Sequence, residues 1–453
     1  MSEDNNNIFL KEYKEIREKI LNNLEQSNPE QAFSEISQIL NYPGSSHLED
    51  NWEDIIRLFG QIIREMGVDQ WNDLIRQIID HPNDADALYD LAYSLYEERL
   101  HSIAATLLLR ADNIKPQEEQ IVSELVINLE FMMLNQEAYN LLSEAKDLLD
   151  SSEICRYLLG FNAIMTDNFT KAEKILLTIQ NSQDEDIQFM ASSLRGMINR
   201  ASVLKKSRSL DNSDLRGWHM VLNGSILLHL SPYGLEDAMY GRYAYVSDSY
   251  SLCRHGIDRV KTVLDTLEIE VPCVLTLPDR SSQILSMATS EILGKPLKFW
   301  DEVDINTKGL IVAYDLDEIY SEEIILDIAD HRSGQILWAH ASCWTYPFPY
   351  APDITTYLHQ SNNSPWGGGG MVYNKNLKRV EISEPDKSEE EALSQKIINA
   401  EEDENFINDL SDLIALVKSL KLIDIESKPG IFRSTGRRLH QRVGSPVLSN
   451  RFV

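Results

Sequence analysis

The sequence predicts a multidomain protein in which an all-α helical solenoid is followed by a small α/β domain and a C-terminal helix. Three observations lead to this prediction. A pattern of small and apolar residues repeats every 34 residues in the first half, and short β-rich runs alternate with amphipathic segments after about residue 212. A last amphipathic stretch, over residues 405–421, predicts one more helix. The chain of 453 residues is longer than one core usually accommodates, so several domains are expected.

The first region, residues 1–84, has an apolar spacing that is typical of helices. Residues 10–80 fit four amphipathic helices. Their boundaries fall near Asn28-Pro29, near Tyr42-Pro43-Gly44 and near Gly67, because proline and glycine interrupt helices. We expect this region to be either a set of degenerate repeats or a helical cap on the array that follows.

Residues 85–210 contain the repeat itself. Ala104 recurs as Ala138 and as Ala172, each 34 residues further on. A small residue at a fixed position is typical of two antiparallel helices that cross closely. Residues 187–207 predict one further helix, which would cover the last exposed apolar face of the array. The apolar residues in phase with the alanines are Leu88, Leu91, Leu95 and Leu108, then Val122, Leu125, Leu129 and Leu142, then Leu159, Ala163 and Leu176.

This spacing resembles the tetratricopeptide repeat, a family in which helix pairs stack into a solenoid. In that family the first helix of each pair lines a concave groove, which binds peptides or helices of partner proteins. The alternative is that some of the side chains at these positions pack against a neighbouring domain. In the same phase, the resemblance implies a protein-binding groove lined by Tyr89, Tyr93, Tyr96, Glu97, Ile127, Glu130, Phe131, Tyr157 and Phe161.

The implied groove favours a basic or apolar ligand. Some members of the family hold a C-terminal carboxylate with a basic, asparagine-rich clamp, and these positions do not match that clamp. Asp86, Glu97 and Glu130 are nearby instead. The expected partner is therefore a protein with a basic or apolar segment.

Residues 212–375 predict the α/β domain, because short apolar runs alternate there with helical segments. Such an alternation indicates parallel strands that are linked by crossover helices. The expected strands are Val221–Leu230, Cys273–Leu277, Leu310–Tyr314 and Gln335–Ala339, and the expected helices lie within Tyr243–Leu267, from Ser281 to Leu293 and from Ser321 to Asp330.

One part of this domain resembles a phosphoribosyltransferase. Cys273–Leu277 with the following Asp279, Arg280 and Ser281 is similar to the first β-loop-α unit of that family, and the run that ends in Asp315 and Asp317 is similar to its ribose-phosphate motif. The resemblance implies that these five residues hold a phosphorylated ligand. However, Leu316 separates the two acids, and Glu318-Ile319-Tyr320 stands where the family has a loop of small residues. A bulky loop with an extra carboxylate would repel phosphate, so an inactive relative or an unrelated α/β domain is the favoured interpretation.

The C-terminal part changes composition twice. Residues 376–404 are rich in acids and predict a linker, and residues 405–421 predict the amphipathic helix. Residues 428–453 contain six Lys or Arg and no Asp or Glu, together with three glycines, so they predict a basic flexible tail. Such a tail could also fold back onto the acidic repeat groove of its own chain.

The charge and hydropathy of the chain exclude some classes of function. The 72 acidic residues against 42 basic ones give a net charge of -30, which makes nucleic-acid binding unlikely because phosphates would be repelled. No apolar stretch is long enough to span a bilayer, and residues 1–30 do not resemble a signal segment. We therefore expect a cytoplasmic protein without membrane contact.

The cysteines and histidines form no recognisable metal or catalytic motif. The thiol–imidazole neighbours Cys253 with His255, and His340 with Cys343, are close in sequence only, and a packed role is expected for them. No catalytic residue, metal site or cofactor is predicted. The four cysteines are far apart and include no CxxC pair, as is usual in a reducing compartment: Cys155, Cys253, Cys273 and Cys343.

Together these features predict an adaptor or scaffold that binds a partner protein through the repeat groove. One alternative is an enzyme with a site for a phosphorylated ligand in residues 212–375. Another is a structural subunit of a larger assembly. The residue types and spacings leave the choice among the three open.

Overall fold

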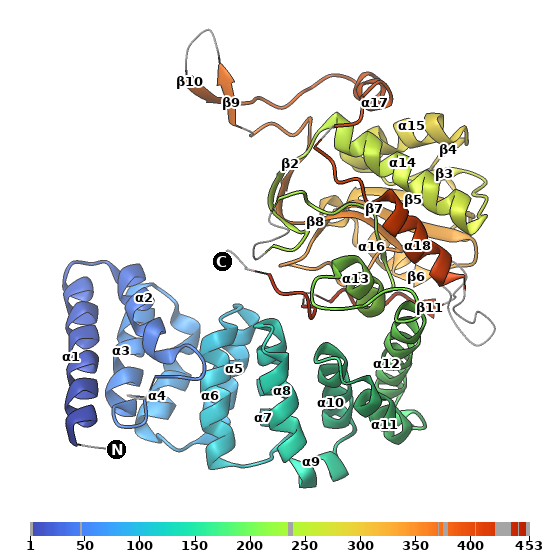
Figure 1. Ribbon diagram of the computed structural model, residues 1–453. Coiled ribbons are helices and arrows are strands. Elements are labelled where there is room, and N and C mark those ends of the chain that lie inside the picture. The colour runs from blue at the N-terminus through green and yellow to red at the C-terminus, as the bar shows by residue number, and fades with distance from the viewer. Residues whose placement is uncertain are drawn as a thin grey trace. The chain divides into compact units, whose positions relative to one another are not determined.

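The computed structural model describes residues 3–45, 48–233, 239–369, 371–374, 379–403, 405–421, 436–442 and 444–449. The chain forms two compact units, Met1–Leu194 (unit 1) and Arg195–Val453 (unit 2). Unit 1 is helical, and unit 2 contains a parallel sheet with helices (Figure 1). The predicted fold class, a helical solenoid followed by an α/β region and C-terminal helices, is confirmed. Within the described residues no helix has the length and apolar character needed to cross a bilayer.

Unit 1 contains helix pairs in sequence order, and the described residues between 10 and 80 hold four α-helices, as predicted. A long helix, α12 (Glu185–Leu204), follows the pairs and continues into unit 2, close to the helix predicted over residues 187–207. The helices before α12 are α1 (Glu3–Glu25), α2 (Pro29–Leu40), α3 (Trp52–Glu65), the 3-10 turn η1 (Asp69–Trp71), α4 (Asn72–Asp80), α5 (Ala85–Glu97), α6 (His101–Ile114), α7 (Glu119–Phe131), α8 (Asn135–Glu144), α9 (Lys146–Ser151), α10 (Glu153–Met165) and α11 (Phe169–Ile179).

The same left-handed turn ends the first helix of five pairs in the described part of unit 1. In each turn, the N–H of the left-handed residue donates to the carbonyl three residues back, and the next N–H donates to the carbonyl five residues back. This pair of hydrogen bonds satisfies carbonyls that a helix end leaves free. The left-handed residues are Ser27 (φ 55°), Gly67 (φ 77°), Arg99 (φ 65°), Met133 (φ 61°) and Asp167 (φ 59°). The turns after α1 and α3 thus have the same hydrogen bonds as the turns after α5, α7 and α10.

Close crossings of helices hold the pairs together. Ala104, Ala138 and Ala172 are fully buried on α6, α8 and α11, which pack against α5, α7 and α10. At Gly160 on α10, an added Cβ would lie 2.8 Å from a methyl group of Leu194, so a larger residue would force that side chain to move. The first helices α5, α7 and α10 also contact one another in succession. We call the surface that these three helices form the first-helix face.

Unit 2 is built on a sheet in which every described pairing is parallel. The strand order is β1-β8-β7-β5-β3-β4, and β2 also pairs with β8. Two small antiparallel pairs accompany it, β6 (Asp330–His331) with β11 (Gly436–Arg437), and β9 (Met371–Asn374) with β10 (Arg379–Ile382). The strands of the main sheet are β1 (Ile226–Leu227), β2 (Tyr243–Ser247), β3 (Val274–Thr276), β4 (Leu297–Phe299), β5 (Gly309–Asp315), β7 (Gln335–Cys343) and β8 (Ile354–Asn363).

Both faces of the central strands are covered, as the continuous apolar runs required. Ile311 on β5 and Leu337 on β7 belong to a core cluster with Ile328 of α16, whereas Tyr314 and His340, which point the other way, meet the residues around α14. The helices of unit 2 are α13 (Leu215–Asn223), α14 (Tyr250–Leu267), α15 (Arg280–Leu293), α16 (Glu322–Ile328), α17 (Glu390–Ile398) and α18 (Leu410–Leu420), with 3-10 turns η2 (Trp300–Glu302) and η3 (Leu316–Glu318).

One predicted strand is largely wrong. Val221–Leu230 begins inside α13, which ends at Asn223 because Gly224 adopts a left-handed conformation (φ 63°). Only Ile226–Leu227 of this run pairs with β8. A short apolar run is compatible with a helix end as well as with a strand, and here the chain uses it for both.

The C-terminal elements belong to unit 2 rather than extending from it. Within the predicted acidic linker, α17 packs against α14 and α15, and the predicted amphipathic helix α18 packs against α14. The guanidinium of Arg216, which is almost fully buried, donates to Asp412 (2.6 Å) and to Asp409, so it fixes the start of α18. The linker and the last helix therefore complete the α/β unit.

The predicted flexible tail is also packed where it is described. We call residues 436–442 and 444–449 the C-terminal strap. Gly436 and Arg437 form β11 against β6, and Arg438, 1% exposed, pairs with Asp353 (2.7 Å). A buried ion pair and a strand pairing hold this segment, so the expectation of a free tail does not apply to the strap. Residues 428–435, 443 and 450–453 of the predicted tail lie outside the described residues.

Candidate functional site

A row of aromatic rings crosses the first-helix face between α5 and α7. We define the aromatic row as Tyr89, Tyr93 and Tyr96 of α5, His101 at the start of α6 and Phe131 at the end of α7. Neighbouring ring centroids are 4.5 to 6.4 Å apart, from Tyr89–Tyr93 to the parallel stack of His101 on Phe131. Tyr93 is 43% exposed and the other four are partly exposed. The row therefore presents accessible aromatic area with a fixed geometry.

Glu124 of α7 lies beside the aromatic row. Glu124 precedes Phe131 on α7 by about two helical turns, as Tyr89 precedes Tyr96 on α5, so the contact of Tyr96 with Phe131 (5.7 Å) sets Glu124 beside Tyr89. Burial raises the pKa of Tyr89 and of Tyr96, and the charge of Glu124 raises both further. Glu124 is only 9% exposed, and its Oε1 has no hydrogen-bond partner among the described residues. Burial also raises the pKa of Glu124 itself. A buried carboxyl without a partner is unfavourable when charged, so it holds a proton or receives a cation.

Polar side chains at the repeat spacing hold the first helices in place. Ser94, Asn128 and Asn162 are 34 residues apart, and each bonds to a side chain at or near the start of the preceding second helix. Both asparagines are fully buried, so these bonds replace lost contacts with water. Their partners are Trp71 Nε1 (2.8 Å to Ser94), His101 Nδ1 (3.0 Å to Asn128) and Asn135 Nδ2 (2.9 Å to Asn162).

These bonds also position the aromatic row and Glu124. Asn128 donates from Nδ2 to the backbone carbonyl of Glu124 (2.9 Å), so its Oδ1 accepts from His101 Nδ1. The amide therefore fixes the imidazole that stacks on Phe131. Asn128 therefore contributes both to the geometry of the aromatic row and to the packing between repeats.

The other residues implied for the groove have different environments. Glu97 is exposed and Ile127 is partly exposed. Glu130 accepts a hydrogen bond from Asn162 (2.7 Å). Tyr157 and Phe161 on α10 are 4% and 3% exposed, so they do not extend the accessible surface. The accessible part of the implied groove is thus centred on α5 and α7.

In unit 2, the second group of predicted residues gathers where the strand order reverses. The chain runs from β3 to β4 on one side and returns to β5 on the other, and ligands of open α/β sheets bind beside such a point. Asp279 caps α15 through Ser282 N (2.7 Å), and Asp315 ends β5, where it accepts from His359 Nε2 (3.1 Å). Burial raises the pKa of Asp279 and of Asp317, and the charge of Asp315 raises both further.

This edge of the sheet is acidic. Burial and the charge of Asp315 raise the pKa of Asp317 to about 6. Burial raises the pKa of Glu318 to about 7, and Asp315 and Asp279 contribute to that shift. Four carboxyls gathered at one edge attract cations and repel phosphate.

Of the other two predicted residues, Arg280 is directed to α17, whereas Ser281 bonds to Glu318 at this edge. Arg280 donates to Glu390 (2.9 Å) and to the carbonyl of Ser388 (2.6 Å) near the start of α17. The hydroxyl of Ser281 accepts from Trp366 Nε1 (3.0 Å). The positive charge that a phosphate would need is therefore directed to α17.

A buried polar cluster links α14 to the sheet. Asp248 Oδ2 accepts from Tyr314 Oη (2.7 Å), from His340 Nε2 (3.2 Å) and from the thiol of Cys253 (3.3 Å). Asp248, Cys253 and His340 could together hold a metal ion, since their ligand atoms lie within 4.8 Å of one another. However, burial raises the pKa of Cys253 well above its usual value, with Asp248 adding to the shift. The thiol is therefore a hydrogen-bond donor rather than a nucleophile. In the fold, Cys253 and His340 both bond to Asp248, and the sequence neighbour His255 lies near Glu402 instead.

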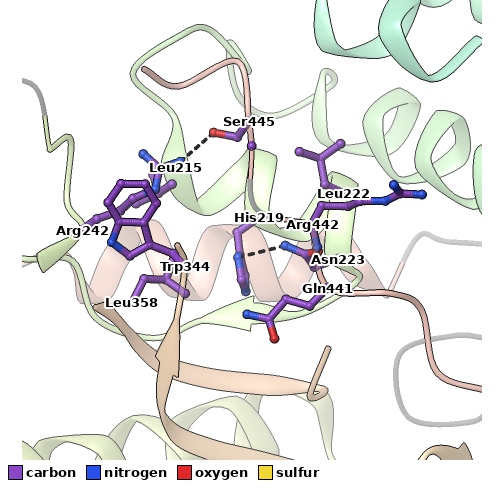
Figure 2. A pocket seen from close by; sticks show the side chains of 11 residues that line it. Leu215, His219, Leu222, Asn223, Arg242, Trp344, Leu358, Gln441, Arg442 and Ser445 are labelled. Atoms are coloured by element: carbon purple, nitrogen blue, oxygen red, sulfur yellow. Dashed lines mark hydrogen bonds between the residues drawn. The ribbon is translucent and has the colours of Figure 1, made fainter. Parts of the chain in front are cut away.

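The C-terminal strap forms one wall of a small cavity of about 20 Å³ (Figure 2). Arg242 donates to Ser445 (2.7 Å), and Asn223 Nδ2 is 3.3 Å from His219 Nδ1. Burial, with the charge of Arg242, lowers the pKa of His219 to about 3, so the imidazole is neutral and carries its proton on Nε2. Gln441 Oε1 faces the same cavity region without a partner among the described residues. A space of this size fits one water molecule rather than a metabolite.

Comparison with known proteins adds no assignment to these sites. No protein-family model matches the chain. No curated protein matches it either. The sites are therefore interpreted from their own geometry.

Sequence reasoning misses several of the residues at these sites. His101 belongs to the aromatic row and Glu124 lies beside it, but neither is among the positions that the resemblance assigns to the groove. The sequence presents Glu318 only as an obstacle to phosphate, and it gives no role to His359. The 34-residue spacing of Asn128 and Asn162 is a signal that could identify the polar contacts.

Proposed function

We propose that the protein is an adaptor or scaffold that binds a partner protein through the first-helix face of a tetratricopeptide-like stack. The observation that carries the proposal is the aromatic row, with Tyr93 43% exposed and Phe131 fixed by the ring of His101. Aromatic side chains provide large contact area and lose little conformational entropy on binding. The repeated hairpins give this row a rigid support. The α/β unit would serve as a second docking or assembly module.

An enzyme that acts on a phosphorylated ligand receives less support. The edge of the sheet at β3 and β5 concentrates Asp279, Asp315, Asp317 and Glu318, and Arg280 is engaged with α17. Phosphate binding needs donors and positive charge at this place. A structural subunit remains the other alternative, and it predicts that the purified chain forms oligomers of defined size.

Selection from a random peptide library on the immobilised full-length chain tests the proposal. Selected peptides should lose binding to a Tyr93→Ala/Phe131→Ala variant. The aromatic row then lacks Tyr93, its most exposed ring, and Phe131, its ring on α7. Tyr320→Ala is the matched control, since Tyr320 is a tyrosine of unit 2 that is 93% exposed. Peptides that bind the double variant as well as the native chain, or a selection that yields no binding peptide, would contradict the proposal. Size-exclusion chromatography with light scattering on the same samples tests the structural-subunit alternative.

A further inference from the structure

Glu124 has a property that distinguishes it from several other acids of unit 1. Glu130, Glu153 and Asp54 each accept a hydrogen bond from a side chain, at 2.7, 2.6 and 2.6 Å. Glu124 is buried to a similar or greater degree, and its Oε1 has no partner in the described residues. The described part of the chain therefore supplies no hydrogen bond to this buried oxygen.

The packing of the repeat does not require an acid at this position. The equivalent residues in the neighbouring copies, 34 positions away, are Asp90 and Leu158. Asp90 is exposed and Leu158 is buried. A leucine thus fills the same place in the third copy, and an apolar side chain at residue 124 would pack without the cost of burying a carboxyl. Packing between helices therefore does not explain why residue 124 is an acid.

The surroundings of Glu124 suit a positive charge. Tyr96 contacts Phe131 (5.7 Å between ring centroids), and about two helical turns earlier on the same two helices Tyr89 lies beside Glu124; both tyrosine rings belong to the aromatic row. A cation beside an aromatic face and a buried carboxylate gains from both interactions. Lys115, which follows α6 in the preceding repeat, pairs with Asp86 (2.5 Å), so that cation is already engaged.

We propose that Glu124 and the tyrosines of the aromatic row form a pocket for one basic side chain, a lysine or an arginine, of the partner. The proposal rests on the proposed function and names the chemistry of the residue that the first-helix face recognises. The cation pairs with the Glu124 carboxylate, and its stem or guanidinium plane lies along Tyr89 and Tyr96. The remaining part of the ligand contacts Tyr93 and Phe131.

A small-molecule titration tests the pocket without knowledge of the partner. The probes are N-acetyl-arginine amide, N-acetyl-lysine amide and the neutral isostere N-acetyl-citrulline amide, added to the full-length chain with ¹³C-labelled tyrosine rings. The arginine or the lysine probe should shift the ring signals of Tyr89 and Tyr96, and citrulline should not. Glu124→Gln should abolish the shift. Equal shifts with citrulline, or a shift that persists in Glu124→Gln, would overturn the proposal.

The selected peptides then measure how much the basic residue contributes to binding. Replacing the basic residue of a binding peptide by glutamine should weaken binding about 30-fold, and the same replacement should have little effect on the Glu124→Gln variant. Glu124→Leu, which places the residue of the third copy at this position, reports whether the fold survives, since it should unfold at the same temperature as the native chain or at a higher one. If peptides bind through Tyr93 and Phe131 but need no basic residue, this inference fails while the adaptor function stands. If no peptide binds, the adaptor function fails and the amino-acid probes still decide on the pocket.

Discussion

Replacing Glu318 by glutamine should stabilise unit 2 relative to the native chain at pH 8 and change its stability little at pH 4.5. Burial raises the pKa of Glu318 from 4.5 to about 7, with added repulsion from Asp315 and Asp279. In the unfolded chain this carboxyl ionises near its ordinary value. Between these two values the folded state keeps a proton that the unfolded state has released, so stability falls as the pH rises. Glutamine cannot ionise and retains the size of the side chain.

The magnitude follows from the size of the shift. Each pKa unit corresponds to about 1.4 kcal/mol, so a shift from 4.5 to about 7 corresponds to about 3 kcal/mol. At pH 8 the Glu318→Gln variant should be more stable than the native chain by up to this amount, and at pH 4.5 the two should be nearly equal. The pKa of Asp317 is raised to about 6 by burial and by Asp315. Asp317 therefore contributes a smaller fall of stability with rising pH, which remains in the variant.

Urea unfolding at pH 5 and pH 8, followed by tryptophan fluorescence, measures the effect. The control is Glu322→Gln, which changes an exposed carboxyl in the first turn of the adjacent helix α16. Its stability should change by less than about 0.5 kcal/mol at either pH. If the difference in stability between Glu318→Gln and the native chain is the same at pH 5 and at pH 8, Glu318 does not keep a proton in the folded state and the reasoning is refuted.

Three further predictions concern the packing of each unit. Arg438→Met should destabilise unit 2 by about 3–5 kcal/mol in urea unfolding, because Asp353 loses its buried cation, whereas Arg437→Met on the exposed side of the strap should have little effect. An equal effect of the two substitutions would mean that the strap is not held by this ion pair. Asn162→Leu should lower stability by about 1–3 kcal/mol, since Asn135 loses its partner; an unchanged melting temperature would argue against the buried amide contact. Because all four cysteines are buried and the pKa of Cys253 is raised, a disulfide reagent should modify the native chain only as fast as it unfolds, and rapid modification at pH 7 would contradict this.

The helical part is predictable from the sequence because its signal is periodic. Ala104, Ala138 and Ala172 are small for a geometric reason, and the same geometry recurs in every pair. The residues that give the surface its character are not periodic. Glu124 differs from its equivalents Asp90 and Leu158, and nothing in its local sequence shows that it is buried beside two tyrosines.

The sheet is predictable where strands are buried on both faces and less so elsewhere. Leu310–Tyr314 is fully buried in β5, and its apolar run is sufficient to identify it. The C-terminal strap escapes prediction because basic and glycine-rich composition is typical of flexible segments, and composition carries no information on distant partners. Arg438 meets Asp353, a residue 85 positions earlier in the chain, and this contact outweighs the local preference.

Repeats provide a comparison within one chain that isolated domains do not offer. Where copies share a residue type, such as the buried Asn128 and Asn162, the common role is packing between helices. In other positions one copy has a different residue type, and the other copies show that helix packing tolerates another side chain. Helix packing then does not explain why that residue type is present. Glu124 meets this condition, because Leu158 fills the equivalent place and the carboxyl at residue 124 is unfavourable to bury. A substitution that stabilises the free chain while weakening a basic ligand, as Glu124→Leu should, would separate the two roles by experiment.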